Sequence, residues 1–109
     1  MTDPIYAVAG IGNAIVDVVA HAEDDFITSH GLQKGGMALI DADQADKLYD
    51  QMGAGIEASG GSAANTMACL ASYGGTGSFI GKVKDDTLGK GFRHDMNATG
   101  IHFNTPAAN

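Results

Sequence analysis

A corner able to bind oxygen-rich ligands lies at residues 60–65 (GGSAAN), where two glycines run straight into an alanine-rich amphipathic helix. Because glycine has no Cβ, the backbone there can approach a ligand closely. We predict that Ser62 caps the helix, whose free N–H groups and positive dipole end lie at the same place. Asn65 follows in the first turn, with an amide that both donates and accepts. These residues predict a corner suited to hydroxyl groups; an ordinary strand-to-helix connection is the alternative.

A second set of polar side chains follows the first apolar segment. Residues 5–12 are apolar on both faces, as is typical of a strand buried between layers. From Asn13 the pattern alternates between polar and apolar residues, so Asn13 and Asp17 face the same way. We therefore predict a half-exposed strand that presents both side chains on one face.

The other reactive residue types show no spacing that indicates a site. Cys69 lies among small apolar residues of a predicted helix and is expected to be inert core. Asp85-Asp86 is expected to cap a helix and pair with Lys90, and Lys82 and Lys84 are expected at a solvated strand end. Metal-ligand spacing is absent from the four histidines, His21, His30, His94 and His102. We predict no metal site.

Size and charge limit the classes of protein that this chain can be. Its 109 residues suffice for one small domain with a modest core, so we assign 1–109 to a single domain. The net charge of −7, without a basic cluster, argues against nucleic acid or an anionic membrane as a partner. The single cysteine, the lack of a signal peptide and the lack of a membrane-length apolar run predict a cytoplasmic protein.

Predicted strands and helices alternate along the chain, which favours an α/β fold with a mostly parallel sheet. Helical spacing, an expected N-cap at Asp41 and stop signals place the helices at 23–30, 41–52, 62–73 and 86–100. Strands are predicted at 5–12 and 78–83, and another begins at 101–103. Three further strands, near 13–21, 36–40 and 55–59, do not fit a fully buried sheet, so we expect them to form a small separate β layer.

Three blocks of the chain, residues 10–17 (GIGNAIVD), 60–65 (GGSAAN) and 79–89 (FIGKVKDDTLG), follow one another in an order that resembles the ribokinase-like (PfkB) carbohydrate kinases. The resemblance covers essentially the whole chain, and the last two blocks together are specific. Asn13, four residues before Asp17, is most similar to the adenosine kinase branch. The resemblance implies the N-terminal portion of a three-layer α/β/α parallel sheet with part of a small β-lid.

The resemblance also implies ATP- and Mg²⁺-dependent phosphoryl transfer to a primary hydroxyl of adenosine or a related sugar or nucleoside. It gives Asp17 the role of accepting hydrogen bonds from two ribose hydroxyls, while Asn65 binds one of them. The backbone N–H of Gly61, beside Gly60, adds a contact, and Asn13 braces the pocket or reaches the ligand through water. A carboxylate that accepts from neighbouring hydroxyls forms short, charge-assisted bonds that orient the sugar. The alternatives are that Asp17 is only solvated and that Asn65 only satisfies the preceding turn.

The catalytic base of the family is expected outside these residues. In the family it is the aspartate of a Gly-Ala-Gly-Asp turn near the far end of the chain. Here Gly53-Ala54-Gly55 is followed by Ile56 at a helix end, so this stretch does not match. We therefore expect no catalytic residue and little of the ATP site, and a chain that is inactive alone. Its expected partners are the sugar or nucleoside, a C-terminal half, or a second copy.

Two other functions match parts of the sequence. A non-catalytic sugar-binding or interaction module would keep the pocket and lack the chemistry. A dinucleotide-binding oxidoreductase is suggested by Gly10 and Gly12 after a strand, but Ile15 occupies the third glycine position and a strand follows in place of a helix. The kinase portion is the leading interpretation, with the binding module as the alternative.

Overall fold

The structure, a computed structural model, describes residues 3–109 and divides into two compact units. The first unit combines the chain up to Asp17 with Ala58–Asn109, and the second unit is Val18–Glu57. The boundary crosses two paired strands, β2 (Ile15–Ala20) and β3 (Gly55–Gly60). Within the described residues, no helix combines the length and the apolar character needed to cross a membrane.

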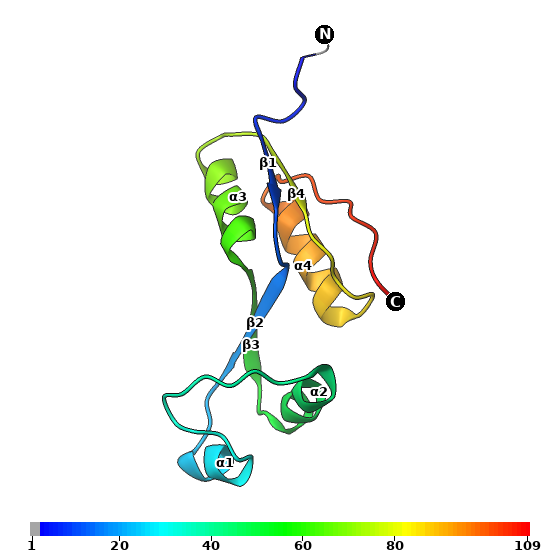
Figure 1. Cartoon of the computed structure of the whole chain (residues 1–109). Coiled ribbons are helices and arrows are strands. Elements are labelled where there is room, and N and C mark those ends of the chain that lie inside the picture. The colour runs from blue at the N-terminus through cyan, green and yellow to red at the C-terminus, as the bar shows by residue number, and fades with distance from the viewer. Residues whose placement is uncertain (1–2) are drawn as a thin grey trace. The chain divides into compact units, whose positions relative to one another are not determined.

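A parallel strand pair forms the centre of the first unit, as Figure 1 shows. It consists of β1 (Val8–Ile11) and β4 (Gly77–Ile80). Parallel strands require a crossover connection, and α3 (Ser62–Ser72), which precedes β4, packs on both of them. A parallel bridge between Ser78 and His102 extends the pairing to the segment after the last helix. The predicted α/β fold with parallel pairing is confirmed for this unit.

Aromatic side chains form the core of the first unit. Phe79 of β4 packs against Phe92, from α4 (Thr87–Ala98), and against Phe103, with ring centroids 5.8 and 5.7 Å away. The Phe92 and Phe103 rings meet edge to face at 5.4 Å, a geometry that the ring quadrupoles favour. All three side chains are at most 2% exposed. Four further buried residues belong to the same cluster: Ala64 and Met67 of α3, Met96 of α4, and Ile101.

The opposite face of the β1–β4 pair is uncovered in the described residues. Ile11 and its register partner Ile80 are 77% and 45% exposed. The expectation that residues 5–12 form a strand buried on both faces is therefore wrong for this chain. The helices α3 and α4 pack on one face of the pair only. Gly10 lies on that face, because a Cβ added to it would contact Met67 of α3.

Local capping sets the start of two helices. Asp41 precedes α2 (Ala42–Gln51) and accepts a hydrogen bond from the Gln44 N–H at 2.8 Å, and the Gln44 side chain accepts one from the Asp41 N–H. Asp86 caps α4 by accepting from the Gly89 N–H at 2.8 Å. Both predicted caps are confirmed.

The start of α3 differs from the prediction. Its cap is Gly61, and Ser62 is already the first helical residue, without a side-chain capping bond. The expectation that Ser62 caps this helix is wrong, because Gly61 makes the turn with a φ of +103° and the helix begins one residue earlier.

The β2–β3 pair confirms the strands predicted near 13–21 and 55–59. Between them in sequence lie α1 (Asp24–Ser29), followed by Gly31 at a φ of +68°, and α2. The predicted strand near 36–40 is wrong, since these residues carry no regular secondary structure. A strand is stable only beside a hydrogen-bonded neighbour, and none of the described strands pairs with this segment, in which Leu39 is 94% exposed.

Candidate functional site

The pairing of β2 with β3 places two predicted site residues together. Asp17 lies on β2 and Gly60 is the last residue of β3, both in the first unit. A Cβ added to Gly60 would stand 2.9 Å from Oδ2 of Asp17. The carboxylate of Asp17 therefore occupies space that any larger residue at position 60 would need. Asp17 itself is exposed to solvent, so its oxygens are accessible to a ligand.

Gly61 makes the turn from β3 into α3 and contacts a third predicted residue. Its φ of +103° and ψ of 147° lie in a region that is almost restricted to glycine. A Cβ there would also stand 2.7 Å from the carbonyl oxygen of Asn13. The backbone of Asn13 thus packs directly against Gly61, while the residue as a whole remains exposed.

Asn65 lies in the first turn of α3, where its backbone N–H donates to the Gly61 carbonyl at 2.8 Å. It is exposed. Aspartate side chains cap α2 and α4, but none of the described side chains caps α3. The first N–H groups of α3 consequently remain available to oxygen acceptors, which the helix dipole favours.

A hydrogen bond on the far side of β3 joins two residues that the sequence does not predict to meet. Ser59, the residue before Gly60, donates from Oγ to Oδ2 of Asp95 on α4 at 2.6 Å. This bond lowers the pKa of the Asp95 carboxyl, partial burial opposes the shift, and His94 adds to it. Asp95 is therefore an anion at neutral pH. Thirty-six residues separate the pair, and no local pattern links them.

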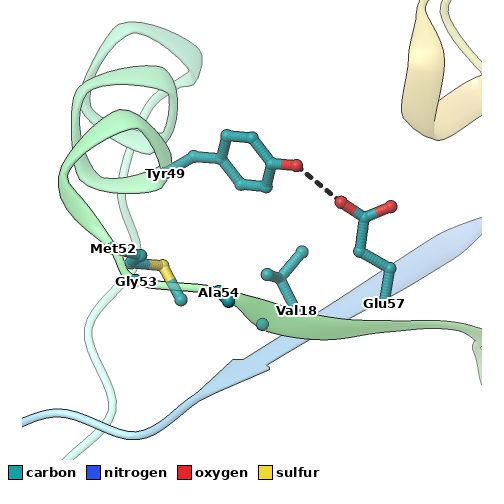
Figure 2. A pocket seen from close by; sticks show the side chains of 7 residues that line it. Val18, Tyr49, Met52, Gly53, Ala54 and Glu57 are labelled. Carbon is teal, nitrogen blue, oxygen red and sulfur yellow. Dashed lines mark hydrogen bonds between the residues drawn. The ribbon is translucent and has the colours of Figure 1, made fainter.

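The second unit contains a cavity of about 290 Å³, shown in Figure 2. Tyr49 of α2 reaches across it and donates from its hydroxyl to Glu57 of β3 at 2.5 Å. This hydrogen bond and the negative charge of Glu57 raise the pKa of Tyr49, so the phenol stays protonated. The sequence contains no signal for this pair. We interpret it as a contact that ties α2 to β3 within the unit, because a protonated phenol is neither a base nor a strong nucleophile.

Other reactive residues do not form a site. The described residues contain no group of three or more His, Cys, Asp or Glu side chains able to hold a metal ion. Cys69 is exposed, so its placement in the core is wrong. Lys82 and Lys84 are exposed beyond the end of β4, as expected. The ion pairs within residues 3–109 do not include the predicted contact of Asp85-Asp86 with Lys90.

The fold and the candidate site both agree with a family match. The first unit has parallel strands joined through a helix, and its glycine corner lies beside an exposed carboxylate. The sequence pattern of the pfkB family carbohydrate kinases matches residues 36–105. The chain belongs to this family of carbohydrate kinases.

Within the family, the chain is similar to adenosine kinases. It is 52% identical to the adenosine kinase from Sinorhizobium meliloti, with a TM-score of 0.75, over 94% of this chain and 32% of that one. It is 43% identical to a probable sugar kinase from Rhizobium etli CFN 42, with a TM-score of 0.76, over 95% of this chain and 32% of that one. Adenosine kinase 2 of Arabidopsis thaliana is 24% identical over 99 residues, which are 85% of this chain and 28% of the relative. The chain therefore spans about a third of the length of these proteins.

Proposed function

We propose that the protein containing this chain transfers a phosphoryl group from ATP to a primary hydroxyl of adenosine or a related nucleoside or sugar. In this proposal the chain carries the site that binds the hydroxyls of the acceptor. The observation that carries the proposal is the exposed carboxylate of Asp17 beside Gly60, at a corner where Gly61 leads into a helix without a side-chain cap. Membership of the kinase family and the 52% identity to the adenosine kinase from Sinorhizobium meliloti support it.

Each site residue receives a role that suits its chemistry. Asp17 accepts hydrogen bonds from two neighbouring ribose hydroxyls, because an ionised carboxylate has acceptor positions for both. Asn65 binds one of the same hydroxyls through its side-chain amide, and the N–H of Gly61 donates to a hydroxyl oxygen. Gly60 leaves the space in which the carboxylate sits. Asn13 braces Gly61 through its backbone and reaches the ligand through water.

These contacts orient the acceptor and supply no proton transfer of their own. Charge-assisted bonds to two adjacent hydroxyls fix the sugar ring in one orientation, which fixes the direction of its primary hydroxyl. Positioning of this kind is the main requirement of phosphoryl transfer, in which little covalent chemistry falls to the protein. The proposed role of this chain is therefore to present the acceptor.

ATP and Mg²⁺ are the cofactors that the proposed reaction requires. The described residues do not gather the acidic ligands that a metal ion needs, and Lys82 and Lys84 are exposed. We assign no contact with either cofactor, and no catalytic base, to a residue of this chain. For the whole kinase we propose a three-layer α/β/α sheet, to which β1 and β4 contribute core strands and β2 and β3 contribute lid strands.

Calorimetry with two nucleosides tests the proposed site. Adenosine should bind the 109-residue chain, whereas 2′,3′-dideoxyadenosine, which lacks both ribose hydroxyls, should bind at least about tenfold more weakly. Asp17→Asn should remove most of this preference. Asp46→Asn, which makes the same change of charge at an exposed position of α2, should leave it unchanged. Equal binding of the two nucleosides by the wild-type chain would contradict the proposal. A second assay, adenosine-dependent consumption of ATP by the whole protein, distinguishes a kinase from a binding module.

A further inference from the structure

The Ser59–Asp95 hydrogen bond lies behind the candidate site. Side chains alternate along a strand, so Ser59 points away from the side on which Gly60 meets Asp17. Both members of the pair belong to the first unit, and their Oγ–Oδ2 distance is 2.6 Å. The bond therefore fastens the backbone next to Gly60 from the side opposite the proposed ligand.

The two ends of this bond differ in how firmly they are held. Asp95 stands next to Met96, which is 3% exposed, and on the same helix as Phe92, which is 0% exposed. The helix around Asp95 is thus anchored in the aromatic core. By contrast, β3 is exposed from Gly55 to Ala58 and becomes buried only at Gly60. Apart from its pairing with β2, few contacts hold the end of this strand, so the hydrogen bond from Ser59 is expected to help fix that end relative to α4.

We propose that Ser59 and Asp95 are positioning residues that hold the Gly60–Gly61 corner in place against Asp17. The inference rests on the proposed function, since it assigns the pair an effect on acceptor binding. When the bond is broken, the end of β3 moves relative to α4, and the N–H of Gly61 loses its fixed distance from the carboxylate of Asp17. Neither Ser59 nor Asp95 has to contact the ligand for this effect.

The size of the effect follows from the chemistry and exposure of the bond. A hydroxyl that donates to a carboxylate forms a charge-assisted bond, which is stronger than a bond between neutral groups. The Asp95 side chain is 52% exposed, so water competes for it and the effect is moderate. We expect Ser59→Ala to weaken adenosine binding by roughly three- to tenfold.

Calorimetry with adenosine on the 109-residue chain and a small set of variants tests this inference. Ser59→Ala and Asp95→Ala should each weaken adenosine binding. Because both substitutions remove the same bond, the affinity of the double variant should be no lower than that of the single variant with the lower affinity. Ser59→Thr keeps the hydroxyl and should retain wild-type affinity. Ser72→Ala, which removes a hydroxyl bonded to the Cys69 carbonyl at the other end of α3, is the matched control and should also bind normally.

Amide hydrogen exchange gives a readout that does not depend on a ligand. The Gly60 and Gly61 N–H groups should exchange faster in Ser59→Ala than in the wild type, while core amides of α4 stay unchanged. Wild-type affinity and exchange in Ser59→Ala, or additive losses in the double variant, would overturn the positioning role alone. If the wild-type chain bound adenosine and 2′,3′-dideoxyadenosine equally, the proposed function would fall, and the positioning role with it.

Discussion

Replacing Gly60 by alanine should weaken adenosine binding while leaving the stability of the fold almost unchanged. The new Cβ would stand 2.9 Å from Oδ2 of Asp17, about half an ångström closer than an ordinary contact. Gly60 does not have a positive φ, so its backbone accepts alanine without strain. The obstructing atom is the end of an exposed and flexible side chain, so the carboxylate swings away while the strand keeps its position.

The magnitude of the loss follows from the displaced carboxylate. A hydrogen bond to a charged group contributes about 1.5–3 kcal/mol, and a binding group must be held within about 0.5 Å of its working position. Displacement of Asp17 by that distance weakens both proposed hydroxyl bonds, which corresponds to roughly ten- to a hundredfold weaker adenosine binding. Alanine lowers the conformational entropy of the unfolded chain relative to glycine, which stabilises the folded state by about 0.4–1 kcal/mol. This gain offsets the cost of the local crowding. The free energy of unfolding should therefore change by less than about 1 kcal/mol.

The assay pairs adenosine calorimetry with urea unfolding of the same variants. Gly91→Ala on α4, where a Cβ would meet nothing within 4 Å, should keep wild-type binding and gain roughly 0.5–1 kcal/mol of stability. Gly61→Ala should lose about 1–3 kcal/mol of stability, because its φ of +103° is strained for alanine. Wild-type affinity in Gly60→Ala, or a binding loss matched by an equal loss of stability, would refute the reasoning.

Three further predictions concern the core, a helix cap and a titrating side chain. Phe92→Ala should lower the free energy of unfolding by about 3–5 kcal/mol in urea, since the ring is 0% exposed between two other aromatic rings. Asp41→Ala should destabilise by about 1 kcal/mol, seen as faster amide exchange in α2, because it removes a capping box. The pKa of His30 is raised, mainly by its hydrogen bond to the Gln51 side chain and further by its hydrogen bond to the Phe26 carbonyl. The stability that these bonds confer is present below about pH 6.5 and is lost as the pH rises through the raised pKa. Because Gln51→Leu removes the first bond, an NMR titration of the His30 imidazole in this variant should give a midpoint closer to the ordinary value.

Helix ends in this protein follow from the sequence, because both partners of each cap lie within a few residues. Asp41 with Gln44, and Asp86 with Gly89, are pairs separated by three positions, and the structure confirms both. The same local logic failed at Ser62, because the glycine before it adopts a conformation that moves the helix start.

Strand predictions succeeded where a partner strand was present. The segments near 13–21 and 55–59 pair with each other, and both form strands. The segment near 36–40 is also rich in apolar residues but has no partner among the described strands, so it remains irregular. Composition indicates that a segment is able to form a strand, whereas the hydrogen bonds that make it one come from elsewhere in the fold.

The sequence by itself determined the family, the alternation of helices and strands, and the glycine corner with its flanking Asn65. Only the tertiary structure decided that Gly60 leaves the space occupied by the carboxylate of Asp17, because β2 and β3 must pair before the two residues meet. It alone also placed Ser59 against Asp95. Contacts between residues distant in sequence depend on chain pairing and packing, which a local pattern of residue types does not encode.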